Sequence, residues 1–373
     1  MNASQIFDAW HNAARALLPT DAEVWDGHSH IGANDPDGVI GRAEDLIGSL
    51  RAAGHRRAVV MTSRDAHGYR AANDRVVAEA SASDGVLIPF LRIDPNDGAG
   101  ALHEVERSLG LGHRGIKLHP RAENFQLSDP TVRRVAETAA QRGIPILVHA
   151  GRGIPSLGAE VVDLCNGVEG LRMILAHAAI SDLSSLGPMV ADVPGIYIDT
   201  SWWDATDLLA LFAWVPPGRI IYASDTPYGS PARSFTLTMR AAVAAGYTAD
   251  QLRGLFGGTL TRVLAGLDGD DLGPPAGDDV VSIDPGLLRV HSTLHGAIVR
   301  TMGGGDNSEP LSLARAACAV PPGTRHEAVF AAITSTLDAV EGAASTSDMV
   351  WLVLLAATAA LTPEVALPSL SLR

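Results

Sequence analysis

The sequence predicts an α/β protein: a (β/α)8 barrel preceded by a helix and followed by a helical extension. Three observations lead to this prediction. Short apolar runs alternate with helical segments from Glu23 to about Gly266. The runs number eight, and eight βα units in roughly 240 residues match a closed barrel. The glycine-rich phosphate loop expected after the first strand of a dinucleotide-binding open sheet is absent.

Each predicted strand is a short apolar run, often β-branched, and strands that alternate with helices pair in parallel through right-handed crossovers. The predicted strands are Val24–His30, Ala58–Thr62, Leu87–Asp94, Gly115–His119, Pro145–Ala150, Met173–Ala178, Ile196–Ser201 and Ile220–Asp225. The segments between them with helical character include Arg42–Ala53, Asn73–Ala82, Pro130–Arg142 and Pro231–Ala245.

Both ends of the chain are expected to contain helices. Within Met1–Pro19, apolar residues recur at helical spacing without an early basic cluster, which indicates an amphipathic helix on the barrel rather than a signal peptide. The longest apolar run, Met349–Leu361, has thirteen residues, whereas a helix needs about 20 to span a bilayer. This run therefore predicts a buried helix, and we expect a soluble, cytoplasmic protein without a membrane partner.

The composition changes after Gly266. The segment Asp268–Asp279 is acidic and rich in glycine and proline, which indicates a linker. From Leu311 onward, helical segments occur without a strand pattern. We therefore assign residues 1–267 to the barrel with its N-terminal helix. Residues 268–373 are assigned to the linker and a helical extension that covers the barrel or makes a subunit contact.

The charge balance and the cysteine content exclude several classes of protein. Lys+Arg total 28 against 42 Asp+Glu, a net charge of −14, which argues against general binding of nucleic acids or anionic membranes. The two cysteines, Cys165 and Cys318, cannot form a disulfide framework and fit a reducing compartment. Lys117 is the only lysine, so one position retains an amine whose pKa the protein can tune.

Five of the eight predicted strands end in side chains that bind metals or transfer protons. These side chains are His28 and His30, Lys117 and His119, His149, His177, and Asp225. Alternate residues of a strand face the same side, so both histidines of the first strand point toward the barrel axis and can chelate one ion. Four histidines and a carboxylate suit zinc, with manganese, iron or cobalt as alternatives.

Taken singly, these residues have ordinary explanations. His149 or His177 alone would more often be a hydrogen-bonded core histidine, and Asp225 could cap the next helix. Their joint position at strand ends favours a metal site. His291 and His295, four apart in the extension, lack the glutamate of a metalloprotease motif. We expect that pair to be packing or surface residues.

The strand-end motifs resemble the amidohydrolase superfamily, in particular the amidohydrolase-2 branch that includes aminocarboxymuconate-semialdehyde decarboxylase. The motifs that carry the resemblance are Asp26–Gly32 (DGHSHIG), Gly115–Pro120 (GIKLHP), Pro145–Gly151 (PILVHAG), Leu175–His177 (LAH) and Tyr222–Pro227 (YASDTP). They lie between Val24 and about Leu264, close to two thirds of the chain. The tail after Gly266 has no recognised counterpart in that family.

This resemblance implies roles for the residues at the strand ends. His28, His30 and His149 would bind the metal together with Asp225, which would also act as the catalytic base. His177 would lie beside the metal as a second catalytic residue and polarise the substrate or the bound water. The chemistry agrees, because a divalent metal lowers the pKa of bound water toward neutrality. A homodimer is an expectation at the level of the family.

Lys117 and His119 lie two residues apart on the fourth strand, so both are expected to point inward. Three roles stay open for the lysine. It is a carbamylated ligand that bridges two metals, a free cation that binds an anionic group of the substrate, or a structural amine bonded to loop carbonyls. We favour the second role and assign both residues to substrate binding.

The substrate is expected to be a small carboxylated molecule. Arg64, Arg121 and Arg152 closely follow strand ends, and guanidinium groups suit the two oxygens of a carboxylate. Trp202 follows the seventh strand and could wall a planar or apolar group, although packing within the loop explains it equally well.

Three functions fit this pattern. The leading one is a metal-dependent hydrolase that cleaves a C–O or C–N bond through a metal-activated water, with Asp225 as the general base. The first alternative is a non-oxidative decarboxylase at the same metal site, which release of carbon dioxide would distinguish. The second alternative is a non-catalytic, metal-containing binding or assembly protein, and the complete ligand set argues against it.

Overall fold

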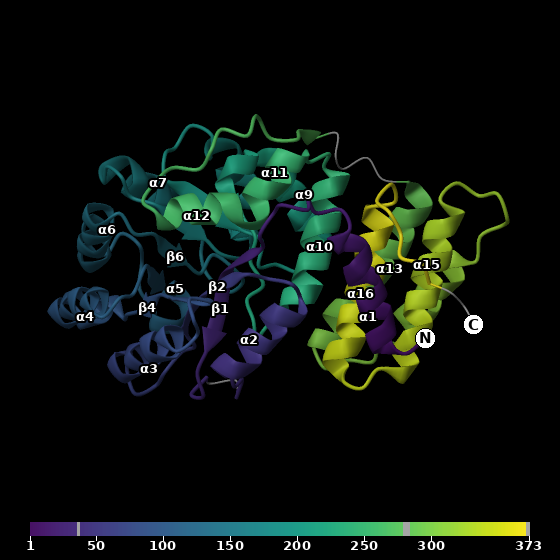
Figure 1. The fold of residues 1–373 in the computed structure, drawn as a ribbon. Coiled ribbons are helices and arrows are strands. Elements are labelled where there is room, and N and C mark those ends of the chain that lie inside the picture. The colour runs from purple at the N-terminus through teal and green to yellow at the C-terminus, as the bar shows by residue number, and fades with distance from the viewer. Residues whose placement is uncertain (36–37, 279–283, 371–373) are drawn as a thin grey trace.

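A closed parallel barrel with eight strand positions forms the body of the computed structural model, which describes residues 1–35, 38–278 and 284–370 (Figure 1). The strands are β1 (Trp25–Ile31), β2 (Arg57–Thr62), β3 (Leu87–Pro89), β4 (Leu91–Arg92), β5 (Ile116–Leu118), β6 (Ile146–Val148), β7 (Met173–Leu175), β8 (Ile196–Asp199) and β9 (Ile220–Ile221). All strand pairs of the two sheets are parallel. The predicted α/β fold is confirmed.

Two places in the barrel depart from regular strand pairing. The third predicted strand, Leu87–Asp94, is divided at Phe90, so that β3 pairs with β2 and β4 pairs with β5. The amide of Phe90 still donates to Val60 O at 2.8 Å, which keeps both parts in one strand position. The ring closes between β1 and the segment after β9, where the amide of Asp225 donates to His28 O at 2.8 Å.

Helices surround the barrel, as the alternating pattern predicts. They are α2 (Ala43–Ala52), α3 (Arg70–Ser81), α4 (Ala99–Gly110), α5 (Pro120–Glu123), α6 (Pro130–Arg142), α7 (Gly158–Gly167), α8 (Leu183–Leu186), α9 (Ala205–Trp214), α10 (Pro231–Ala244), α11 (Ala249–Arg253) and α12 (Thr259–Leu264). The four predicted helices form within three residues of their expected bounds. At α6, Pro130 begins the helix, and the Asp129 side chain caps it by accepting the Thr131 amide at 2.7 Å.

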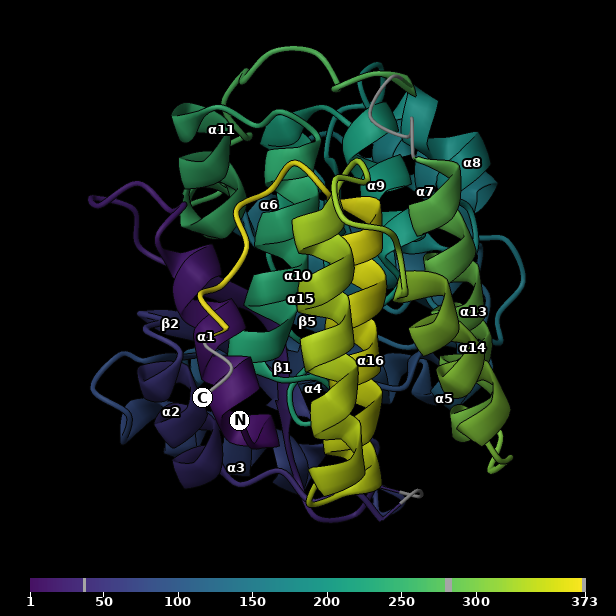
Figure 2. The ribbon, with the colours of Figure 1, turned by 90° about the vertical axis from the view of Figure 1, so that its right-hand side faces the viewer.

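In the part of the extension that the structure describes there are four α-helices, which lie beside the barrel together with the N-terminal helix (Figures 1 and 2). These helices are α13 (Pro285–Met302), α14 (Ser308–Cys318), α15 (Glu327–Asp338), α16 (Thr346–Leu361) and the N-terminal α1 (Ala3–Arg15). Within the described residues, no strand follows Gly266. The long apolar run lies in α16, whose residues 352–361 are all buried. No helix in the described ranges is long and apolar enough to cross a membrane.

Helix α10 joins the barrel to the extension. A surface helix buries only one face, but ten of the fourteen residues of α10 are buried. The reason is that α1 and α16 pack on the side of α10 that faces away from the barrel. Arg240 of α10 is 1% exposed. Its guanidinium donates to Thr362 O at 3.0 Å and to Ala366 O at 2.9 Å, and it lies 4.8 Å from the centre of the Trp10 ring. The barrel, the N-terminal helix and the end of the chain therefore share one buried contact.

The acidic linker runs along the barrel. It was predicted over residues 268–279, of which residue 279 lies outside the described ranges, and residues 268–277 form no helix or strand. The amide of Gly269 donates to the Tyr197 hydroxyl at 2.9 Å. A Cβ at Gly218 would come 2.0 Å from Asp270 O, so this close approach of linker and barrel requires glycine.

Candidate active site

The strand-end residues surround a polar cavity of about 440 Å³. It lies where the strands of the barrel end, and loops converge there in parallel barrels to form active sites. The lining residues are His28, His30, Asp35, Arg64, Arg92, Lys117, His119, Arg121, Ala122, His149, His177, Asp225 and Tyr228. Nine of the eleven predicted site residues are among them, and Arg152 and Trp202 line an adjoining cavity.

Three of the predicted metal ligands converge on one point. His28 and His30 project from β1, and Asp225 follows β9. The Nε2 atoms of the two histidines lie 3.0 Å apart. Asp225 Oδ1 lies 3.4 Å from the first of these nitrogens and 3.2 Å from the second. A set of two imidazoles and a carboxylate with this spacing is suited to one divalent cation.

Hydrogen bonds on the far side of each ring show which nitrogen presents a lone pair. His28 Nδ1 lies 3.0 Å from the Asp199 carboxylate, and His30 Nδ1 lies 3.4 Å from Thr62 O. Both partners are acceptors, so in each ring Nδ1 carries the proton and Nε2 carries the lone pair. Burial lowers the pKa of both imidazoles and keeps them neutral. Two lone pairs and a carboxylate oxygen this close repel one another without a cation, so the residues fit a metal.

His149 and His177 form a pair beside this group. His177 Nδ1 lies 2.9 Å from Ser201 O and carries the proton, so its Nε2 accepts from His149 Nδ1 at 3.0 Å. The remaining nitrogen, His149 Nε2, is buried and has no hydrogen-bond partner among the described residues. His149 does not belong to the three converging residues, but its Nε2 offers an unpaired lone pair in the same cavity.

His177 and Asp225 have backbone conformations that are unusual for residues with a Cβ. Their φ angles are 61° and 55°, in the left-handed region that costs about 1–2 kcal/mol. Buried bonds hold both amides, to Asp199 Oδ1 at 3.0 Å and to His28 O at 2.8 Å. Strain of this kind is concentrated at functional sites. Asp225 does not cap α10, which begins later, at Pro231.

The two oxygens of Asp225 face different partners. Oδ1 faces the histidines of β1, and Oδ2 lies 4.0 Å from His177 Nδ1. Burial raises the pKa of the carboxyl, but its close contact with His30 and the nearby His177 and Lys117 side chains outweigh burial, so the pKa lies below its ordinary value. Asp225 is therefore an ionised carboxylate that can bind a cation with one oxygen and accept a proton with the other.

Lys117 and His119 reach the cavity from β5 and from the residue that follows it. Lys117 is 1% exposed, and its Nζ lies 3.1 Å from His28 Nε2. Burial lowers the pKa of this amine to about 7, so both of its protonation states are accessible near neutral pH. His119 stacks on His149 with ring centres 3.9 Å apart and planes 12° apart. It is therefore placed to orient the His149 ring.

The other predicted substrate-binding residues lie around the mouth. Arg64 and Arg121 are exposed residues that line the polar cavity, and Arg152 lines the adjoining cavity. The Arg152 guanidinium lies 5.4 Å from the centre of the Trp202 ring. The indole N–H of Trp202 donates to Asp207 at 2.6 Å. Trp202 thus packs within its loop and also lines a cavity, and its contact with a substrate stays a prediction.

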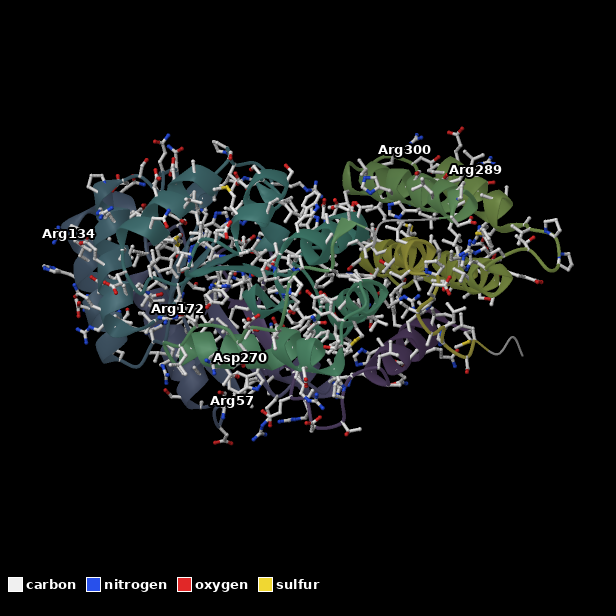
Figure 3. All side chains as sticks on the ribbon, turned by 90° about the horizontal axis from the view of Figure 1, so that it is seen from above. Arg57, Arg134, Arg172, Asp270, Arg289 and Arg300 are labelled. Carbon is white, nitrogen blue, oxygen red and sulfur yellow. The ribbon has the colours of Figure 1, made fainter. Side chains whose placement is uncertain are left out.

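Sequence analysis missed two buried charged residues of the site, Arg92 and Asp199. Arg92 ends β4, lines the polar cavity and pairs with Glu123 at 2.7 Å. Asp199 ends β8 and accepts the Nδ1 proton of His28. Each is a charged residue at the end of an apolar strand, so the sequence contained the signal. Exposed arginines such as Arg134 and Arg300 project instead from the outer surface (Figure 3).

A second histidine–aspartate group lies between the barrel and the extension. Asp204, which caps α9, pairs with His295 Nδ1 of α13 at 2.9 Å. One turn earlier, His291 is buried with Nδ1 3.3 Å from Ala357 O of α16. These contacts agree with the packing role expected for the two histidines. Because the three side chains could also hold a cation, metal-binding measurements need a control for this group.

Comparisons with known proteins agree with this arrangement. The family model described as Amidohydrolase matches residues 8–265, which include every strand of the barrel. No curated protein sequence matches the chain.

Solved structures with the same fold cover the barrel but not the whole chain. A Staphylococcus aureus protein provisionally named as an amidohydrolase is 15% identical with a TM-score of 0.54, covering 65% of this chain and 99% of its own. 5-Carboxyvanillate decarboxylase from Sphingomonas paucimobilis is 15% identical with a TM-score of 0.53, and the match covers 66% of this chain and 99% of that protein. A Pseudomonas putida protein provisionally named 2-pyrone-4,6-dicarboxylic acid hydrolase is 18% identical with a TM-score of 0.50. This match covers 66% of this chain and 98% of that protein.

At these identities the structural similarity shows the fold, a barrel to which this chain adds about a third of its length. The family model spans well over half of the residues and includes all five strand-end motifs. The chain therefore belongs to the amidohydrolase-2 family, as its motifs predicted.

Proposed function

We propose that the protein is a metal-dependent hydrolase that cleaves a C–O or C–N bond of a small carboxylated substrate. The observation that carries this proposal is the convergence of His28 Nε2, His30 Nε2 and Asp225 Oδ1, three electron-pair donors within 3.4 Å of one another. His149, with its buried and unpaired Nε2, is the fourth donor in this proposal. A set rich in nitrogen suits zinc, with manganese, iron or cobalt as alternatives.

The chemistry divides between the metal and the side chains. A divalent metal held here supplies a Lewis acid that polarises the scissile carbonyl and lowers the pKa of water. Asp225 accepts the proton of the attacking water at Oδ2 and returns it to the leaving group. His177, with Nδ1 4.0 Å from that oxygen, steadies the carboxylate and borders the space for the reacting bond.

The cations of the polar cavity support a carboxylated substrate. Those that line it are Arg64, Arg92, Lys117 and Arg121, whereas its acidic residues are Asp35 and Asp225. The lining is thus locally positive in a chain with a net charge of −14, which favours anions over neutral molecules. In this proposal Lys117 acts as a free cation, because a bound carboxylate stabilises its protonated form.

The test compares zinc-loaded and metal-free protein on carboxylated lactones and amides, beginning with 2-pyrone-4,6-dicarboxylate. We expect NMR to show water addition by the zinc-loaded protein alone. Asp225→Asn keeps a side-chain oxygen but removes the base, and we expect a rate about 10²–10⁴-fold lower. The zinc content of the variant is measured alongside, so that loss of metal is not mistaken for loss of the base. Turnover without metal, or a wild-type rate in zinc-loaded Asp225→Asn, would contradict the proposal.

A decarboxylase is the second candidate, and the cation cluster favours it. The same side chains could hold a carboxylate that leaves as carbon dioxide, and 5-carboxyvanillate decarboxylase shares the fold. Labelled 5-carboxyvanillate tests this reaction. Release of labelled carbon dioxide, with no hydrolysis of the lactones and amides, would replace hydrolysis by decarboxylation.

Metal stoichiometry distinguishes the roles open for Lys117. We expect one metal at the β1 histidines, unchanged by Lys117→Ala, when the protein carries His291→Ala to disable the second histidine group. Two metals that fall to one on Lys117→Ala would instead indicate a carbamylated lysine bridge. No metal after incubation with zinc or manganese would contradict both enzyme hypotheses and leave a non-catalytic binding role, without the metal that the alternative assumed.

A further inference from the structure

A second cavity, of about 550 Å³, adjoins the polar one. The residues common to both linings are Arg121, His149, His177, Asp225 and Tyr228. Two of these, Asp225 and His177, are the proposed catalytic residues. The second cavity therefore leads away from the reacting centre rather than forming a separate site, and its volume is in the range of small-molecule sites, about 300–1,000 Å³.

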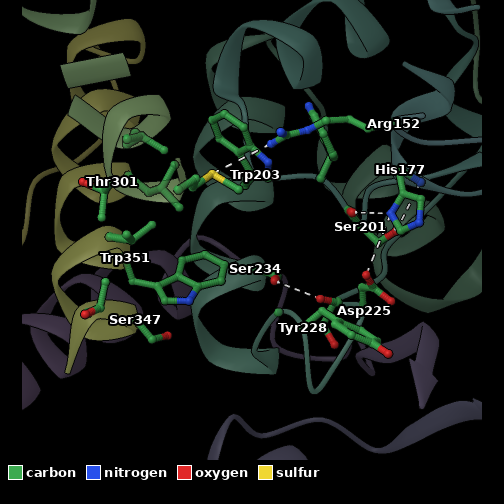
Figure 4. A pocket seen from close by; sticks show the side chains of 18 of the residues that line it. Arg152, His177, Ser201, Trp203, Asp225, Tyr228, Ser234, Thr301, Ser347 and Trp351 are labelled. Atoms are coloured by element: carbon green, nitrogen blue, oxygen red, sulfur yellow. Dashed lines mark hydrogen bonds and ion pairs between the residues drawn. The ribbon is translucent and has the colours of Figure 1, made fainter. Parts of the chain in front are cut away.

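The walls of this cavity come from both parts of the chain. On the barrel side, Trp202 and Trp203 follow β8. On the other side, the apolar lining residues of the extension are Ile298 and Met302 of α13 and Val350, Trp351 and Leu354 of α16. Figure 4 shows Trp351 and Thr301 facing the space from the extension, opposite His177 and Asp225. The extension thus closes one side of the candidate active site.

The two cavities differ in chemistry. The polar one contains four cations, whereas the second contains two, Arg121 and Arg152, together with three tryptophans and four aliphatic or thioether side chains of the extension. In the described part of the chain, Asp225 is its only carboxylate. Arg152 stands between the walls, 5.4 Å from each of the Trp202 and Trp203 ring centres and 3.8 Å from Met302 Sδ. An anionic group suits one cavity and an uncharged, flat or branched group suits the other.

Part of this apolar surface is exposed to solvent, as Met302 shows. Met302 is 53% exposed although it lines the cavity, and methionine adapts its shape to varied apolar groups. A bound group that covers it would remove apolar surface from water, which favours binding.

We propose that the substrate carries an apolar group at least as large as an aromatic ring, which lies between Trp202/Trp203 and helices α13 and α16. This inference rests on the proposed function, because it places the carboxylate and the reacting bond at the metal centre. The extension is then a substrate-binding part that selects for the apolar group, and barrels of this family without such an extension lack that wall.

Calorimetric titration of zinc-loaded protein with benzoate and with biphenyl-4-carboxylate tests the proposal without turnover. The two acids differ by one phenyl ring. We expect the longer acid to bind about 10-fold to 100-fold more tightly, the effect of burying one large apolar side chain.

Two matched variants locate the effect. Ser347→Trp adds an indole at an exposed position that lines the cavity, and it should reduce the preference for the longer acid to about threefold or less. Val299→Trp adds the same ring at a 51% exposed position of α13 outside the lining, and it should keep the wild-type preference. Circular dichroism of both variants checks their folding.

Equal affinity for the two acids, binding of neither, or a preference that survives Ser347→Trp in a folded variant would overturn the inference. The proposed function fails separately. Metal-dependent hydrolysis with no preference for the longer acid would refute the apolar subsite alone, whereas a preference without any metal-dependent hydrolysis would refute hydrolysis alone.

Discussion

Among single residues, those that support the proposed metal ligands from behind give the first prediction. Asp199 accepts the Nδ1 proton of His28 at 3.0 Å and the amide of His177 at 3.0 Å, and it is fully buried. Asp199→Asn replaces this charged acceptor by a neutral amide, so the lone pair at His28 Nε2 becomes less basic. We expect the affinity for zinc to fall about 10-fold to 100-fold, measured by competition with a chromophoric chelator.

Asp182→Asn is the matched control for this measurement. Asp182 is also buried, but it accepts the amides of Leu157 and Gly158 at the start of α7 and lines neither cavity. Its substitution should change the free energy of unfolding and leave the affinity for zinc as in the wild type. An unchanged affinity in Asp199→Asn would show that the carboxylate does not support the metal ligand.

The alternation of strands and helices in the sequence predicted which residues lie together at the candidate site, but not how their side chains pair. The ends of eight strands meet at one edge, so residues such as His28 and Asp225 could be assigned to one place before any distance was known. The pairing of His149 with His177, and not with the β1 histidines, depends on ring orientation, which periodicity does not determine. The role of Asp199 could not be assigned from the sequence, because it depends on a contact with His28 of another strand, 171 residues away in the chain.

At the scale of elements, the same contrast holds for the helices and strands. The bounds of α6 follow from local chemistry, a proline after a capping aspartate, and they were predicted from the sequence. The division of the third strand at Phe90 was not predicted, since it depends on how two neighbours pair. The near-complete burial of α10 was not predicted either, because the helices that cover it lie far away in the sequence.

The packing of α2 against α10 buries a histidine and leads to a prediction about the pH dependence of stability. His55, just after α2, lies with its ring 5.4 Å from Tyr222 and 5.9 Å from Phe235, and neither ring nitrogen has a partner among the described residues. Burial, with smaller contributions from the charges of His11 and Arg15, lowers its pKa from 6.5 to about 3. The unfolded chain therefore binds a proton below about pH 6.5 that the folded protein does not bind until about pH 3.

This difference lowers the free energy of unfolding as the pH falls from 6.5 toward 3. At pH 5 the loss from this one residue is about 2 kcal/mol relative to pH 8. We expect His55→Phe to reduce the difference in urea-unfolding free energy between pH 8 and pH 5 by about that amount. The same substitution at the exposed His103 should leave the difference unchanged, and equal pH dependence in wild type and His55→Phe would show that His55 titrates normally.

At the scale of the whole molecule, the extension is held by buried contacts at several points. The Trp10 indole donates to Thr336 of α15 at 3.0 Å, and Arg240 of α10 binds carbonyls after α16. Removing residues 268–373 would uncover the second face of α10 and much of α1. Each large apolar side chain exposed costs about 1.5–3 kcal/mol, and several such losses are comparable with the total stability of a domain, about 5–15 kcal/mol.

We therefore expect residues 1–267 alone to lose cooperative thermal unfolding and to bind a hydrophobic dye, although sequence composition divides the chain at that point. The control is the full chain with a protease site inserted after Gly273, where a Cβ meets nothing within 4 Å, then cut but not separated. The cut chain should keep cooperative unfolding and zinc binding, because packing rather than the linker holds the extension. If residues 1–267 unfold cooperatively and bind zinc with wild-type affinity, the barrel is an independent domain. In that case the extension contributes to the active site without contributing to the stability of the barrel.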